Sequence, residues 1–169
     1  MRVSHFSFAV LLVACASKSP PPTSAPRPGC RIANAGPVVG YTYRNTPPPQ
    51  PTAGTIGDGT YDLVEIVRHT SQPGPWSSGQ APAFRWAMQF KTTETSSNHT
   101  SGILLAAVEV PPSVSCGGVR FATFQNELRV EGGFKGIESV AYTAQGNTLA
   151  IVDPDGDGGD PVTYVFRRR

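Results

Sequence analysis

The stretch that decides the fold is Ala83–Lys91, with the sequence AFRWAMQFK. Large apolar side chains occupy every second position of it, at Phe84, Trp86, Met88 and Phe90. Successive side chains of a β-strand point to opposite faces, so this period of two gathers the large residues on one face and the polar ones on the other. The stretch therefore predicts a half-buried strand of an antiparallel sheet.

Seven further stretches have the composition of strands, because they are rich in β-branched and aromatic residues and are bounded by Gly, Pro, Asn or Asp. They are TYDLVEIVRH (60–69), SGILLAAVEV (101–110), GVRFATFQ (118–125), ELRVEGG (127–133), IESVAYTA (137–144), TLAIVD (148–153) and PVTYVFRR (161–168). No segment has a useful 3.6-residue apolar period. We expect an all-β domain, a single small antiparallel meander barrel or half-barrel of about seven or eight strands, with a two-sheet β-sandwich as the alternative.

The large residues of these strands form the expected apolar interior. The set comprises Tyr61, Leu63, Phe84, Trp86, Met88, Phe90, Tyr164 and Phe166. An eight-stranded barrel is only just wide enough to hold its own side chains. We therefore expect a mostly packed interior with at most a shallow apolar mouth.

The N-terminus has the features of an export signal. One early cation, Arg2, precedes the apolar run Phe6–Ala14, which is too short for a helix that crosses a membrane. The run ends in LVAC, Leu12–Cys15, which resembles the lipobox of bacterial lipoproteins. The resemblance implies cleavage before Cys15 and attachment of a lipid to its thiol. The alternative is an ordinary signal peptide that is cut nearby, for example after Ala16.

The lipobox resemblance also implies a location. Residue 16, directly after the cysteine, is not aspartate, and the usual bacterial sorting pattern then favours the outer membrane. We expect an exported, lipid-anchored protein that faces the periplasm or the cell surface.

Proline divides the chain. Ten of the 17 prolines lie between Lys18 and Gly54, and a segment so poor in apolar side chains cannot bury enough surface to fold. The expected organisation is a signal peptide (1–14), a Pro-rich tether (15–36), a short strand with a Pro-rich linker (37–53) and a barrel-like domain (54–169). Within the third segment, PVVGYTYR (37–44) has the pattern of a short edge strand.

If Cys15 carries lipid, the remaining cysteines are Cys30 and Cys116. An even pair in an exported protein favours a disulfide between them, which would pin the tether to the domain. Two unpaired thiols, or bonds to another molecule, are the alternatives. No second cysteine or histidine lies at a spacing that suggests a metal site.

The two ends of the strand region resemble small lipocalin-like domains of bacterial envelope lipoproteins. In that family a G-x-Y/W-x-L strand opens the meander, and a Y-x-x-x-G-x-x-L hairpin with an aromatic strand ending in arginine closes it. The matching residues here are Gly59, Tyr61, Leu63, Tyr142, Gly146, Leu149, Tyr164, Phe166 and Arg167. The resemblance covers about the C-terminal two thirds and implies a meander barrel; Tyr61 stands where the family has tryptophan.

The stretch DPDGDGGD, Asp153–Asp160, resembles the first half of a calcium-binding loop, with carboxylates at Asp153, Asp155 and Asp157. An EF-hand needs a glutamate at its twelfth position, where this chain has Tyr164. The stretch lies between two predicted antiparallel strands, and Asp, Gly and Pro are turn residues. We expect a solvated turn, with a calcium site as the weaker alternative.

Nothing in the sequence forms a catalytic motif, so we expect a protein that is not an enzyme and has no cofactor. His69 and His99 lack partner motifs, and a net charge of +2 is too small to suggest a nucleic-acid partner. The expected function is a lipid-anchored, monomeric binding or structural module. The alternatives are a carrier of a small apolar ligand, and an enzyme or enzyme inhibitor on the same scaffold.

Overall fold

A computed structural model describes residues 32–33, 35–71, 83–96, 99–110, 113–133, 136–156 and 159–169. These residues form nine β-strands: β1 (Tyr41–Arg44), β2 (Gly59–His69), β3 (Arg85–Thr95), β4 (His99–Val110), β5 (Ser113–Phe124), β6 (Glu127–Gly133), β7 (Gly136–Gln145), β8 (Thr148–Asp153) and β9 (Val162–Arg168). Among these residues no helix is long and apolar enough to span a membrane.

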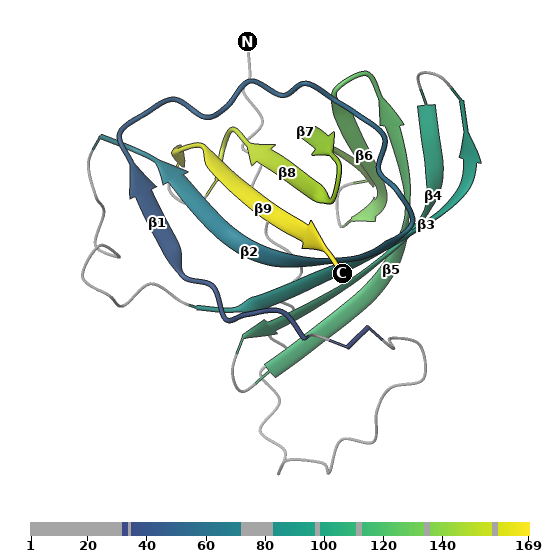
Figure 1. Ribbon diagram of the computed structural model, residues 1–169, viewed down its shortest axis with the longest axis horizontal. Helices are drawn as coiled ribbons and strands as arrows, with labels where there is room; N and C mark the ends of the chain where they lie inside the picture. The colour runs from purple at the N-terminus through teal and green to yellow at the C-terminus, as the bar shows by residue number, and fades with distance from the viewer. Residues whose placement is uncertain are drawn as a thin grey trace.

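Strands β2 to β9 form a closed barrel. Each strand pairs with the next in the chain, and β9 returns to pair with β2, so the sheet has no beginning or end (Figure 1). All of these pairings are antiparallel. The predicted all-β meander barrel is therefore confirmed, and the two-sheet sandwich is wrong because the β2–β9 pairing joins the ends of the sheet.

Strand β1 is an extra strand outside the meander. It runs parallel to the second half of β2, with Tyr41 opposite Ile66, and Val39 just before it forms a bridge with Phe84. β2 pairs with β3 only over Gly59–Asp62, which lies opposite Ala87–Phe90 of β3. The N-terminal segment therefore fills the gap that opens where these two strands diverge.

Because β1 is parallel to β2, the connection between them must return along the whole barrel. In Figure 1 this dark blue segment arches from the end of β1 past β7–β9 to the start of β2. Ala53 forms a parallel bridge with Thr143 of β7, and Ile56 is buried in the core. The connection from residue 45 to residue 58 thus closes one end of the barrel.

A hydrogen bond and a close approach of two backbone segments hold this connection in place. The hydroxyl of Tyr142 donates a hydrogen bond to the carbonyl of Gly54 at 2.8 Å. At Gly54 φ is 118°, and a Cβ there would lie 2.0 Å from the carbonyl oxygen of Ala144. Only glycine fits this position, because both the backbone angle and the contact exclude a side chain.

Aromatic side chains fill the interior. Phe90 contacts Tyr61 and Phe121 edge to face, with ring centres 5.5 and 5.1 Å apart. Trp86 makes the same kind of contact with Tyr164 at 5.6 Å and Phe166 at 5.1 Å. Edge-to-face geometry is the favoured arrangement of aromatic pairs and adds to the energy of burial.

Candidate functional site

The residues that the sequence assigns to the interior lie in the barrel core. Tyr61, Leu63, Trp86, Met88, Phe90, Tyr164 and Phe166 are all buried, and Phe84 is partly buried against them. These side chains contact one another across the barrel, as the ring contacts above show. In the part of the chain that the structure describes, they act as packing residues.

The aspartate-rich stretch forms the turn between β8 and β9. Asp153 is 1% exposed, and its Oδ1 accepts a hydrogen bond from the backbone N–H of Asp155 at 3.1 Å. The carboxylate of Asp160 pairs with Arg68 at 2.9 Å. The Asp153 contact is the side-chain-to-backbone hydrogen bond of a turn, but the burial of Asp153 differs from the solvated turn that the sequence predicted. Asp157 lies outside the described residues, and within them no three His, Cys, Asp or Glu side chains gather as a metal site would require.

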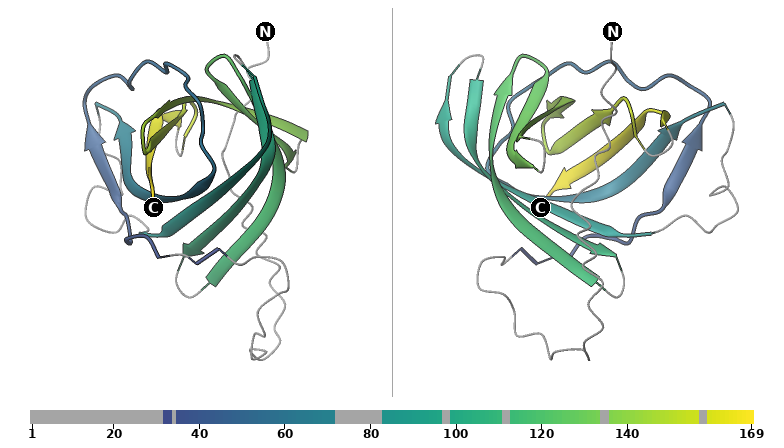
Figure 2. Two further views of the ribbon diagram at one scale, coloured as in Figure 1. Left: turned by 45° about the vertical axis from the view of Figure 1, so that its right-hand side comes forward. Right: turned by 180° about the vertical axis from the view of Figure 1, so that it is seen from behind.

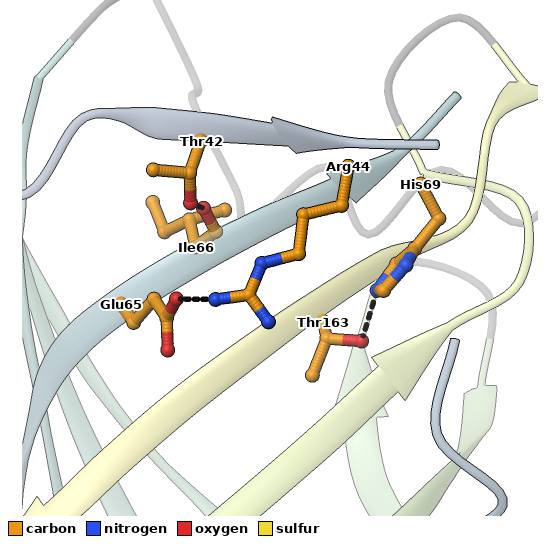
Figure 3. A network of polar contacts seen from close by, with 6 residues as sticks. All are labelled: Thr42, Arg44, Glu65, Ile66, His69 and Thr163. Carbon is orange, nitrogen blue, oxygen red and sulfur yellow. Dashed lines mark hydrogen bonds and ion pairs between the residues drawn. The ribbon is translucent and has the colours of Figure 1, made fainter. Parts of the chain in front are cut away.

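His69, at the end of β2, joins the segment that follows β1 to β9 (Figure 3). Its Nδ1 is 2.9 Å from the carbonyl of Thr46, and its Nε2 is 2.9 Å from the hydroxyl of Thr163. A carbonyl can only accept, so Nδ1 donates, and Nε2 of the neutral ring accepts from Thr163. His69 is therefore engaged in structural contacts.

Two further contacts in Figure 3 fasten β1 to β2. The hydroxyl of Thr42 donates to the carbonyl of Ile66 at 2.6 Å, and Arg44 pairs with Glu65 at 2.9 Å. These contacts explain why a strand of only four residues stays on the barrel.

Cys116 ends a row of outward-facing residues that crosses four strands. The row pairs Asp62 of β2 with Ala87 of β3, Ala107 of β4 and Cys116 of β5. Trp86 and Met88, on either side of Ala87, point into the core, so Ala87 points outward. Ala87 and Ala107 are nevertheless only 0% and 2% exposed. The outer surface is therefore covered at Asp62, Ala87 and Ala107, whereas Cys116 at the end of the row is exposed.

The start of the described chain is anchored on the same row. Nε and Nη2 of Arg169 donate to the carboxylate of Asp62 at 2.6 and 2.7 Å, and Nη2 also donates to the carbonyl of Ala33. This bidentate contact to Asp62 raises the pKa of Arg169, so the guanidinium stays charged. Ala33 is thereby held close to β2.

This anchor fits the predicted Cys30–Cys116 disulfide. The three residues from Cys30 to Ala33 reach about 10 Å when extended, and a disulfide adds about 5.5 Å between α-carbons. Three strand spacings, from β2 to β5, amount to about 14 Å. Cys30 and Cys15 lie outside the described residues, so the disulfide and the lipidation remain predictions.

A surface groove on the outer face of β3–β6 is the candidate site. Its volume is about 460 Å³. The lining residues are Thr93, His99, Ser101, Gly102, Ile103, Arg120, Phe121, Ala122 and Glu131. Among the residues of this groove are a cation, a carboxylate, an imidazole and hydroxyl groups.

The groove lies where the β3–β4 hairpin bends. The pairing of β3 with β4 shifts between Thr92 and Glu94, which is a β-bulge, and a bulge bends its strand. At Gly102, opposite Thr92, a Cβ would lie 2.1 Å from the carbonyl oxygen of Lys91. The close approach of the two backbones requires glycine here, so Gly102 permits the bend that shapes the groove.

Charges of both signs face one another in the groove. Ile103, Arg120 and Glu131 pair in register across β4, β5 and β6. Arg120 and Glu131 are exposed, and among the described residues neither belongs to an ion pair. The groove can therefore offer hydrogen bonds and one charge of each sign to a polar group.

An ion pair and an exposed ring border the groove. Arg129 donates two hydrogen bonds to Glu127, at 2.9 and 3.1 Å, and these lower the pKa of the Glu127 carboxyl. The guanidinium of Arg129 also lies over the ring of Phe124, 5.5 Å from its centre, and Phe124 is 49% exposed.

Comparisons with known proteins identified no relative of this chain. A scan against models of protein families found no match, and neither did searches of curated proteins and of solved structures. The lipocalin-like resemblance thus holds for the architecture, an eight-stranded meander barrel with an extra strand, and no family is identified.

The sequence did not reveal the groove. His99 lies in the Ser- and Thr-rich stretch TETSSNHTSG, which is typical of a loop, whereas it is the first residue of β4. Glu131 is one of several glutamates scattered over different strands. The groove depends on the register of four strands and on a bulge, and the sequence signals neither. The glycine at 102, inside an otherwise continuous strand pattern, is the one local sign of a bend.

Proposed function

We propose that the protein is a lipid-anchored protein of the bacterial cell envelope, whose barrel is a non-catalytic binding or structural module that acts through its outer surface. The observation that carries the proposal is the packed interior, in which Trp86 contacts both Tyr164 and Phe166. A carrier of an apolar ligand needs an internal cavity lined by apolar side chains. Here the apolar side chains already contact one another.

The outer groove supports the same proposal. Its polar lining, with Arg120, Glu131 and His99, suits a polar group better than a lipid chain. Because its charged residues are exposed, each contact is expected to be weak, and a partner would need several of them. The N-terminal lipobox resemblance supports the membrane anchor.

A fluorescent fatty acid tests the choice between surface module and carrier. We expect the full-length chain to show no saturable binding of this probe. The matched variants are Trp86→Ala in the interior and Ile103→Ser in the groove. Saturable 1:1 binding that Trp86→Ala abolishes, with the melting temperature unchanged, would establish the carrier function instead. Binding that only Ile103→Ser abolishes would place a lipid site on the outer surface.

Lipidation is tested separately by metabolic labelling with palmitate in bacterial cells. We expect the wild type to be labelled and Cys15→Ser to be unlabelled, because the thiol accepts the lipid. The control variant is Cys116→Ser, which should keep the label. Equal labelling of the wild type and Cys15→Ser would show that the lipobox assignment is wrong. Recovery of the labelled protein only from the inner membrane would contradict the outer-membrane location.

A further inference from the structure

Small residues form the floor of the outer groove, and larger ones stand on both sides of it. Ser101 of β4 and Ala122 of β5 pair in register on this floor. Residues two positions away on a strand share its face, so the neighbouring rows form two walls. One wall comprises Ile103, Arg120 and Glu131, and the other comprises His99 and Phe124. In Figure 2 the β3–β4 and β5–β6 hairpins lie side by side, and the groove spans both.

The dimensions of the groove suit a small molecule. Its walls are about 13 Å apart between Cα atoms, because His99 and Ile103 are four residues apart on β4 and a strand rises about 3.3 Å per residue. Side chains occupy part of this distance. The volume of about 460 Å³ agrees, since small-molecule sites range from about 300 to 1,000 Å³.

One wall carries two opposite charges close together. Arg120 and Glu131 are exposed and lie directly opposite each other on neighbouring strands. The Cβ atoms of such residues are about 5 Å apart, which is close enough for opposite charges to pair. Among the residues that the structure describes, neither side chain belongs to an ion pair, whereas Arg129 on the same face pairs with Glu127. The wall therefore presents a donor guanidinium and an acceptor carboxylate to a ligand.

This lining fits a ligand with one charge of each sign better than other small molecules. A lipid chain would meet mostly polar side chains along the groove. A polyanion such as inorganic phosphate would be attracted by Arg120 but repelled by Glu131. An uncharged ligand would leave both residues without a counter-charge. Within the described residues, no three His, Cys, Asp or Glu side chains gather to hold a metal ion.

We propose that the groove binds a small zwitterion of dipeptide size, whose carboxylate contacts Arg120 and whose ammonium group contacts Glu131. This inference rests on the proposed function, because it names the ligand class of the groove on the outer surface. A carboxylate can accept two parallel hydrogen bonds from a guanidinium. Two residues of extended peptide span at most about 7 Å, which suits two side chains that lie opposite each other without touching.

The neighbour of Arg120 adds a preference for the second residue of the dipeptide. Ile103 pairs with Arg120 in register and is 39% exposed. A carboxylate on Arg120 places the adjoining side chain of the ligand beside Ile103. An apolar C-terminal residue gains most from this contact, because apolar surface is removed from water on both sides. The dipeptide Ala-Leu is therefore the probe of choice.

An NMR titration of the full-length chain with Ala-Leu tests the site, with Cys15→Ser to prevent the predicted lipidation. We expect saturable shifts of the backbone amides of Gly102 and Ala122 in the groove, and none of the buried Phe166. The Kd should lie in the millimolar range, because exposed charge contacts are individually weak. Absence of saturable shifts up to about 20 mM, well above that range, would overturn the inference.

Blocked forms of the dipeptide test the two charges of the ligand. Ala-Leu amide lacks the carboxylate, and N-acetyl-Ala-Leu lacks the ammonium group. Each should bind about three- to fivefold more weakly than Ala-Leu, the factor that one exposed ion pair supplies. Equal binding of all three forms would contradict the proposed contacts. Leucine, with its two charges closer together, should bind more weakly than Ala-Leu, and equal binding would contradict the dipeptide size.

Variants of the two charged residues show which end of the ligand each one contacts. Arg120→Gln should weaken binding of Ala-Leu about three- to fivefold and leave the Kd of Ala-Leu amide unchanged. Glu131→Gln should weaken binding of Ala-Leu and leave the Kd of N-acetyl-Ala-Leu unchanged. Both residues are exposed, so both variants should fold. A variant that weakened all forms of the dipeptide equally would show a change in groove shape instead, and the assigned contacts would be wrong.

The matched control is Arg129→Gln. Arg129 is an exposed arginine on the same face, but Glu127 already occupies its guanidinium. This variant should leave the Kd for Ala-Leu within about twofold of the wild type. A failure of the inference differs from a failure of the proposed function. Absent shifts overturn only the zwitterion, whereas shifts confined to interior residues such as Trp86 and Phe166 would overturn the surface module as well.

Discussion

Replacing Trp86 by alanine is expected to lower the free energy of unfolding by about 3–5 kcal/mol, the usual range for loss of a large aromatic side chain from a core. Trp86 is 5% exposed and contacts two further aromatic rings, of Tyr164 and Phe166. On one side β3 is held to β4 by an unbroken ladder from Arg85 to Thr92, which limits how far the barrel can collapse into the space that the indole leaves. Thermal and urea unfolding should show the loss, with a fall in melting temperature of about 10–20 °C.

The control for this prediction is Phe124→Ala. Phe124 is also aromatic and belongs to the same barrel, but it points outward and is 49% exposed. Its removal should cost less than about 1 kcal/mol. If Trp86→Ala were no more destabilising than Phe124→Ala, the interior would not be packed as described, and the proposal of a surface module would lose its main support.

Removing the disulfide with the double variant Cys30→Ser/Cys116→Ser is expected to lower the free energy of unfolding by up to about 4 kcal/mol, because the bond closes a loop of about 86 residues in the unfolded chain. The anchor between Arg169, Asp62 and Ala33 brings the chain to within reach of Cys116. Urea unfolding under oxidising conditions measures the effect, and non-reducing mass spectrometry should find the two cysteine-containing peptides joined.

Reduction provides the matched control. A thiol reductant should lower the stability of the wild type to that of the double variant and should leave the double variant unchanged. Cys15→Ser should have no effect on unfolding, because the sequence places Cys15 in the Pro-rich tether, before the predicted barrel domain. Free thiols at both Cys30 and Cys116 in the exported protein would contradict the prediction, whatever the stability of the variant.

The strands of the barrel could be predicted because their signal is local. In Ala83–Lys91 the alternation of large and polar residues alone sets which face is buried, and the structure places Trp86, Met88 and Phe90 in the core. The ends of the strands were harder to predict from the sequence. The composition of TETSSNHTSG (Thr93–Gly102) is that of a polar turn, but β3 runs to Thr95 and β4 begins at His99, because threonine suits a strand as well as a turn.

The candidate site was far less predictable than the strands. Ile103, Arg120 and Glu131 are up to 28 positions apart in the sequence and meet only because β4, β5 and β6 pair in one particular register. Register is set by turns and by the burial of one face across the whole barrel. No local pattern around any one of the three residues indicates the other two.

The sequence by itself determined that this protein is a meander of antiparallel strands with an aromatic interior, because alternation and turn residues act over a few neighbouring positions. Only the tertiary structure decided how the sheet closes, through β9 and β2, and where the segment around Ala53 and Ile56 goes. These features depend on contacts between distant residues, which only the tilt and stagger of the closed barrel bring together.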